Sequence, residues 1–193
     1  MKKRKEKLGR EGAIKGTMLN AHLAWVAEKV PDASEKLRPH LGPECLPCID
    51  RAVLATDWVP FRCIVEVDKA IAAVVGGVPD DVYRELGKRS AILNLGGVYK
   101  GFVVDEPHRF FEQMALLHSR FQSFGRSFYE RTGERSGRIG LEGYDEYSPV
   151  YCTSALGYFV EALQLMKVPG PARGHEVSCQ CAGDRACVYE LSW

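Results

Sequence analysis

The chain has 193 residues, of which 46% are hydrophobic and 26% charged, and 26 basic residues balance 25 acidic ones. A chain of this length forms one substantial core or at most two small ones. The balanced charge excludes a global field that would attract nucleic acid or anionic lipid. The sequence also lacks an apolar run of the roughly 18 residues that span a bilayer. We therefore expect a cytoplasmic protein with no direct nucleic-acid or membrane partner.

The chain begins with the basic run "MKKRKEK". Terminal charge runs usually stay solvated, so we expect residues 1–13 to be a disordered basic N-terminus and residues 14–193 to form a single domain. The start has no apolar segment of the kind found in signal peptides. Thiols stay reduced in the cytoplasm, and the seven cysteines are an odd number. Both facts favour metal binding or reactivity over a framework of disulfides.

Apolar spacing predicts a mostly helical N-terminal half. Residues 14–30 keep one apolar stripe at helical spacing, and "PDASEKL" begins a second, short helix. The run 61–77 predicts an apolar helix that a glycine pair ends. Pro79 and the two acids after it begin a further helix that should run to about Lys100.

The clearest helical pattern is "DEPHRFFEQMALLHSRFQSFG", which should form one helix that ends at Gly125. Its apolar face predicts the wall of a ligand pocket, although the same face also fits a plain packed core. Two histidines, His118 here and His22 in the first helix, fit either core positions or ligands of haem or a metal. The residues predicted to line the pocket are Phe110, Phe111, Met114, His118 and Phe121.

The pattern changes to alternation after this helix. Residues 126–144 predict a β-hairpin, and residues 172–193 predict a second hairpin around Gly183. Between them, Ser148 and Pro149 form an N-cap and N1 pair that begins a helix. The fold class is therefore α+β, with a helical N-terminal half and an antiparallel sheet of two hairpins flanking a helix.

Strand parity predicts that the cysteines of the last hairpin point to one face. A three-residue turn from Gly183 would set Cys181 across from Cys187, with Cys179 diagonal to that pair. The natural candidate for the fourth ligand is Cys152, at the start of the preceding helix, where the helix N-terminus favours a thiolate. Four thiolates make a closed, structural zinc site. The predicted ligands are Cys152, Cys179, Cys181 and Cys187.

Other interpretations of these cysteines stay open. Glu176 is an alternative ligand, but parity places it on the opposite face unless the strand bulges. The thiols also fit a packed core, because free cysteine is among the most buried residue types. Four cysteines hold an iron–sulfur cluster as well as zinc.

A second group of cysteines lies near residue 45. The spacing of Cys45 and Cys48 in "CLPC" fits a redox pair or half a metal site, but the neighbouring prolines favour an incidental pair in a loop. Cys63 lies in an apolar run and is expected in the core.

The end of the chain, "CQCAGDRACVYEL", resembles the closing motif of the V4R (4-vinyl reductase-like) domain family. Cys179, Gly183, Asp184 and Cys187 fall on the places of that motif, and Cys152 matches the family's upstream cysteine. The resemblance covers roughly residues 80–193. The front, "KGTMLNAHLAWV" and "VYRELGKR", is similar to an uncharacterised paralogous family of myxobacterial proteins.

The V4R resemblance implies the α+β fold of TRAPP-type trafficking subunits, a zinc site of cysteines that sometimes includes a glutamate, and a buried pocket for small apolar or aromatic molecules. Cys181 departs from the family, which usually has a small residue there. The expected function is that of a non-enzymatic, zinc-stapled sensory domain that regulates a separate output protein. A homodimer interface is one path by which ligand binding could be transmitted. The alternatives are a redox or tetrapyrrole-related protein with an iron–sulfur cluster or haem, and an assembly or scaffold subunit.

Overall fold

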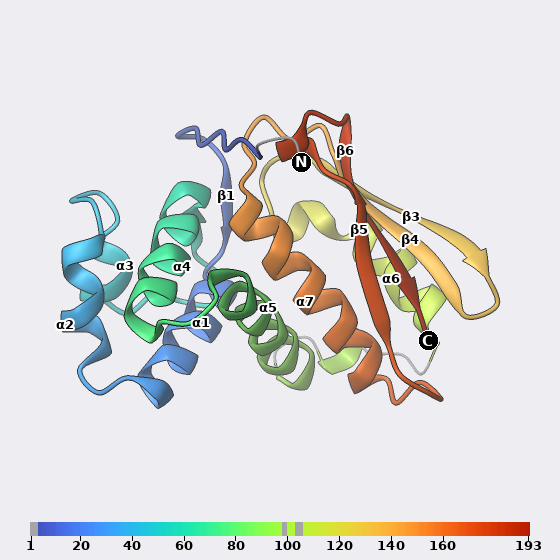
Figure 1. Cartoon of the computed structure of the whole chain (residues 1–193), viewed down its shortest axis with the longest axis horizontal. Helices are drawn as coiled ribbons and strands as arrows, with labels where there is room; N and C mark the ends of the chain where they lie inside the picture. Colours follow the sequence, from blue (N-terminus) through green and yellow to red (C-terminus); the bar gives the residue numbers. More distant parts are fainter. Residues whose placement is uncertain (1–3, 98–99, 103–105) are drawn as a thin grey trace.

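The computed structural model describes residues 4–97, 100–102 and 106–193, and it confirms the α+β fold class. A helical region and an antiparallel sheet lie on the two sides of one long helix, α7 (Figure 1). The helices are α1 (Gly16–Lys29), α2 (Ala33–Leu37), α3 (Pro47–Asp50), α4 (Phe61–Val75), α5 (Pro79–Gly96), α6 (Pro107–Leu116) and α7 (Pro149–Leu165). The strands are β1 (Ala13–Lys15), β2 (Trp58–Pro60), β3 (Arg126–Gly133), β4 (Ser136–Glu142), β5 (Arg173–Ser178) and β6 (Ala186–Ser192).

The large sheet has the strand order β3-β4-β6-β5, and its neighbouring strands are antiparallel. The two predicted hairpins thus form one sheet, joined where β4 pairs with β6. In that pairing Leu141 lies opposite Cys187. Ser148 caps α7 as predicted, because its hydroxyl oxygen accepts a hydrogen bond from the Val150 amide. The small sheet of β1 and β2, whose strands have three residues each, was not predicted from the sequence.

Two glycines let α5 and α7 pack backbone against backbone. A Cβ atom at Gly87 would overlap the carbonyl oxygen of Ser154, and one at Gly157 would overlap the carbonyl oxygen of Arg84. Because each glycine faces the other helix, the contact tolerates no side chain at either position. This close crossing joins the helical region to the helix that carries the sheet.

Buried apolar residues form two clusters. One cluster lies among the helices of the N-terminal half and includes Phe61, Ile64 and Ile71 of α4. The other lies between α6, α7 and the large sheet and includes Phe159 and Tyr189. We call them the N-terminal core and the C-terminal core.

The helix predicted up to Gly125 ends earlier than expected. α6 stops at Leu116, and a single 3-10 turn, η3 (His118–Arg120), follows. Beyond it the chain hydrogen-bonds to β1: the Lys15 amide donates to Phe121 O and the Ser123 amide to Ala13 O, each at 2.9 Å. These tertiary backbone bonds replace the helical ones that the local pattern predicted.

Cys45 and Cys63 form a disulfide, contrary to the expectation that these thiols stay reduced. Their Cα atoms are 5.1 Å apart and 18 residues apart in the chain, within the usual Cα range for a disulfide. Cys63 is buried as expected, but its partner is Cys45. Cys48 is free and buried, and burial raises the pKa of its thiol.

The described part of the basic N-terminus runs along the main body. The Lys5 amide donates to Cys181 O at 2.7 Å, and Lys7 forms an antiparallel bridge with Tyr147. Among the described residues, no helix combines the length and the hydropathy needed to span a membrane.

Candidate functional site

Four cysteine sulfurs converge where α7 meets the end of the large sheet. The Sγ atom of Cys152 lies 3.5 Å from that of Cys187, 3.8 Å from that of Cys181 and 3.9 Å from that of Cys179. All four side chains are buried. Sulfur ligands about 2.3 Å from a tetrahedral zinc ion lie about 3.8 Å from one another. The separations from Cys152 therefore have the scale of a tetrahedral thiolate site.

The local backbone that assembles the cysteines differs from the predicted one. Cys179 follows the end of β5, and Cys181 lies in a 3-10 turn, η4 (Gln180–Ala182). Only Cys187 belongs to a strand, so simple strand parity was the wrong reason for the convergence. Gly183 ends the turn with φ 97°, a left-handed conformation that favours glycine.

Glu176 reaches the same cluster because β5 is irregular. The register of β5 against β6 shifts between Glu176 and Ser178, which is the bulge that a glutamate ligand required. One ligand atom each of Cys152, Glu176, Cys179 and Cys187 lies within 4.8 Å of the others. Burial is the main cause that raises the pKa of Glu176 to about 7.

One cysteine of the cluster, Cys179, differs from the others in the direction of its pKa shift. Hydrogen bonds from Cys152, and then from the other two cysteines, hold the pKa of Cys179 far below its ordinary value. The Arg4 guanidinium adds to this effect, since it donates to Cys179 Sγ at 2.8 Å and to Glu176 at 2.6 Å. The pKa of Cys152 and that of Cys187 are raised, mainly because each shares a hydrogen bond with a neighbouring sulfur. The role of Arg4 was not predicted from the sequence, because residues 1–13 were expected to be disordered.

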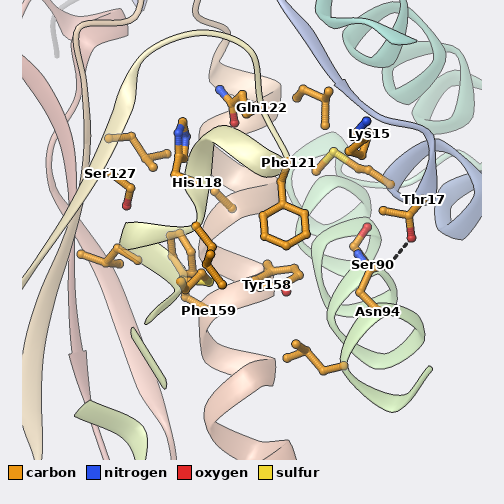
Figure 2. Close-up of a pocket in the computed structure, with 18 of the residues that line it drawn as sticks. Lys15, Thr17, Ser90, Asn94, His118, Phe121, Gln122, Ser127, Tyr158 and Phe159 are labelled. Atoms are coloured by element: carbon orange, nitrogen blue, oxygen red, sulfur yellow. Dashed lines mark hydrogen bonds between the residues drawn. The ribbon is translucent and has the colours of Figure 1, made fainter. Parts of the chain in front are cut away.

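A separate cavity of about 160 Å³ lies between the helical region and the sheet. α1, α5, η3, α7 and the large sheet all contribute to its wall (Figure 2). Most lining side chains are apolar or aromatic. A cavity of roughly 150 Å³ with such a wall holds one benzene ring.

Four of the five residues predicted for the pocket line this cavity: Phe110, Met114, His118 and Phe121. Phe111 does not, because it is fully buried and stacks on Tyr129, with ring centroids 5.5 Å apart. Seven polar residues that were not predicted for the pocket also line the cavity. These residues are Lys15, Thr17, Ser90, Asn94, Gln113, Gln122 and Ser127.

The two histidines singled out in the sequence have different surroundings. His118 lines the cavity; its Nε2 lies 2.7 Å from Tyr144 Oη, and its buried Nδ1 has no hydrogen-bond partner. Burial lowers the pKa of His118, so the imidazole is neutral at pH 7. His22 is fully buried behind the cavity, where its Nδ1 lies 2.6 Å from Asp68 Oδ1 and its Nε2 lies 3.0 Å from Ser90 Oγ.

No family model matches the chain, and no curated protein is similar to it in sequence. Several solved structures to which it is similar are H-NOX domains. An unliganded Fe(II) H-NOX mutant from K. algicida has a TM-score of 0.71 at 10% identity, over 93% of this chain and 96% of that one. An H-NOX protein from S. oneidensis in the Fe(II)NO state has 0.67 at 13% identity, over 93% and 98%. An oxygen-binding H-NOX domain related to soluble guanylate cyclases has 0.67 at 12% identity, over 92% and 91%.

These similarities correct the expected family. The consistent structural neighbours are H-NOX domains rather than V4R domains or TRAPP-type subunits, so the V4R assignment is wrong. The short cysteine motif at residues 179–187 led to that assignment, whereas the structural match covers more than nine-tenths of the chain. At 10–13% identity the match shows the fold alone: the chain has the H-NOX fold.

Proposed function

We propose that this chain is a ligand-binding sensory domain that holds a small apolar molecule in the cavity beside His118. The observation that carries this proposal is the cavity of about 160 Å³ between the helical region and the sheet. A ligand there touches α1 and α5 on one side and η3 and the sheet on the other. Its presence therefore biases how the two parts pack, and a separate output protein or a second copy of the chain reads that change.

Cavity filling tests this proposal. Ala155 of α7 lines the cavity, so Ala155→Leu should occupy part of the space and abolish the binding of toluene, measured by NMR titration. Ala115→Leu makes the same change on α6, at a position that does not line the cavity, and should leave toluene binding intact. Native mass spectrometry of freshly purified protein would reveal a co-purified molecule. Failure of the wild-type protein to bind toluene would overturn the proposal.

The second candidate ligand is haem, the cofactor named for similar H-NOX structures. The donor chemistry fits, since His118 is a neutral imidazole at the cavity wall with one unpartnered nitrogen. The space and the charge do not fit. The cavity is about the size of one aromatic ring, and a haem is several times larger.

Haem also carries two carboxylates that need cationic partners. Lys15 is the one lysine or arginine among the described lining residues, and it is engaged: its Nζ donates to Thr56 O at 2.7 Å and lies 3.8 Å from the Trp58 ring centroid. Hemin titration distinguishes the two candidates. A Soret band in the wild-type protein that is lost in His118→Ala would favour haem over the small apolar ligand.

We propose in addition that the four cysteines hold one structural zinc ion. The sulfur separations of 3.5–3.9 Å around Cys152, the lowered pKa of Cys179 and the burial of all four side chains support this assignment. The ion would fasten η4 and β6 to the first turn of α7. Four protein ligands leave no vacant position, so the ion would stabilise the fold rather than catalyse a reaction.

Elemental analysis tests the metal, and paired substitutions identify its fourth ligand. The purified protein should contain one zinc per chain and be colourless, whereas a brown protein with iron would indicate an iron–sulfur cluster. Cys181→Ser should weaken zinc binding strongly and Glu176→Gln should not, if Cys181 completes the site. The reverse result would assign that place to Glu176. Absence of any metal would contradict the zinc site and indicate that the four cysteines are packed thiols of the core.

A further inference from the structure

The cavity has polar groups on two sides of an otherwise apolar wall. Thr17, Ser90 and Asn94 gather on the side of α1 and α5, whereas Gln122 and His118 lie beyond the ring of Phe121 in the same view (Figure 2). A buried polar group costs free energy unless it has a partner. On each side, one of these polar groups has hydrogen-bonding capacity that the protein itself does not use.

On the first side, a buried relay of three side chains ends at the cavity. Asp68 and His22 are 1% and 0% exposed, do not line the cavity, and lie behind Ser90, which does. The Asp68 carboxylate accepts from His22 Nδ1, and His22 Nε2 lies 3.0 Å from Ser90 Oγ. The relay fixes the position of the Ser90 hydroxyl at the wall.

The relay leaves one hydrogen-bonding capacity of Ser90 for a ligand. If the His22 ring is neutral, Nε2 accepts the Ser90 proton, and the Ser90 oxygen is left as an acceptor. If the ring is protonated, Nε2 donates to Ser90, and the hydroxyl proton is left to donate. A ligand hydroxyl both donates and accepts, so it pairs with Ser90 in either state.

On the second side, an amide donor has no acceptor. Gln122 is 4% exposed and lines the cavity, and its Oε1 accepts from Tyr151 Oη at 2.7 Å. This bond orients the amide. The buried Nε2 on its other side lies near His118 and Tyr144 but makes no hydrogen bond of good geometry. An oxygen acceptor on a ligand would satisfy it.

We propose that the cavity takes a small neutral aromatic molecule of one ring, with a hydroxyl group bound to Ser90 and a carbonyl-type oxygen bound by the Gln122 amide. This inference rests on the proposed function, that the cavity binds a ligand. The volume of about 160 Å³ sets the size of one substituted ring. The ligand is neutral because Lys15 is already engaged and His118 is uncharged at pH 7.

Four probes and two variants test the proposal by calorimetric or NMR titration. The probes are toluene, p-cresol, benzaldehyde and 4-hydroxybenzaldehyde, which carry neither group, the hydroxyl, the carbonyl and both. In the wild-type protein p-cresol and benzaldehyde should each bind about tenfold tighter than toluene, the upper end for one neutral hydrogen bond. 4-Hydroxybenzaldehyde should bind tightest of the four.

The variants should remove one advantage each. Ser90→Ala should bring p-cresol to the affinity of toluene and leave the advantage of benzaldehyde. Gln122→Met should do the opposite. Toluene affinity serves as the internal control that the cavity of each variant is intact.

The possible failures are distinguishable. If toluene binds to the wild-type protein and the polar probes bind no tighter, the ligand class is wrong and the proposed function stands. If each variant weakens all four probes equally, Ser90 and Gln122 support the wall without recognising the ligand, and the inference fails. If no probe binds, the proposed function fails, and this inference fails with it.

Discussion

Single buried side chains determine the chemistry of both candidate sites. The pKa of Cys179 lies far below its ordinary value because three sulfurs and Arg4 surround it, and His118 is neutral because the cavity wall buries it. Neither property follows from residue type, since an unperturbed cysteine is a thiol at pH 7 and an unperturbed histidine titrates near pH 6.5.

The lowered pKa of His118 makes stability depend on pH. In the unfolded chain this histidine takes up a proton near pH 6.5, but in the folded protein it does so only at a lower pH. The free energy of unfolding should therefore fall as the pH drops below about 6.5. The fall should stop once the pH lies below the pKa that His118 has in the folded protein. Urea unfolding between pH 7.5 and pH 5 measures this. His118→Gln should show a shallower fall, and an identical slope in the variant would contradict the prediction.

At the scale of elements, the contact between α5 and α7 depends on two positions without side chains. Gly87 and Gly157 each face a backbone carbonyl of the opposite helix, so the helices approach more closely than side chains would allow. Glycine disfavours a helix interior by about 1 kcal/mol relative to alanine, and the close packing must offset that cost.

Gly157→Ala should therefore destabilise the protein although alanine is the better helix former. The added methyl group meets backbone, which cannot rotate away, so we expect a loss of about 1–3 kcal/mol. Thermal and urea unfolding measure the change. Gly96→Ala is the matched control at the end of α5, where an added Cβ meets no atom within 4 Å. Equal effects at the two positions would show that the helix contact does not require glycine.

The cysteine cluster links three elements that are far apart in the chain. Cys152 lies in α7, Cys181 in η4 and Cys187 in β6. If zinc joins them, its removal by a chelator should lower the melting temperature and raise amide hydrogen exchange in β5 and β6 more than in α4, which lies in the N-terminal core. Uniform exchange throughout the chain would contradict a local metal staple.

At the scale of the whole molecule, the two cores have different covalent support. The N-terminal core contains the disulfide between Cys45 and Cys63. The C-terminal core contains the cluster of four free cysteines to which Cys152 belongs. The cavity lies between the helical region and the sheet, in position to couple the two cores.

Reduction of the disulfide should destabilise the molecule. The bond joins residues 18 apart, and closing a loop of about this length contributes about 3 kcal/mol in the chain-entropy account. A phosphine reductant should lower the free energy of unfolding by that order in urea titrations. The double variant Cys45→Ala and Cys63→Ala should show no further loss on reduction. A loss of the same size in the double variant would place the reductant's effect elsewhere, for example at the cysteine cluster.

The local sequence pattern predicted secondary structure correctly where the residues that form an element lie close together in the sequence. The stripe of 61–77 became α4, Ser148 and Pro149 began α7, and both hairpins formed. Prediction failed where contacts with residues far away in the sequence changed the structure that the local pattern indicated. α6 ends early because β1 takes the backbone groups of the segment after η3, and Cys63 pairs with Cys45 rather than packing as a thiol.

The sequence by itself determined the α+β class and the order of the elements, because hydrophobic period, helix caps and turn residues act over a few residues. Only the tertiary structure decided which fold this is, that β5 bulges to bring Glu176 to the cysteines, and that Ser90 and Gln122 face one cavity. Those facts depend on how elements far apart in the chain pack together. A stripe of apolar residues has the same pattern whether its neighbours fill the space beside it or leave it open.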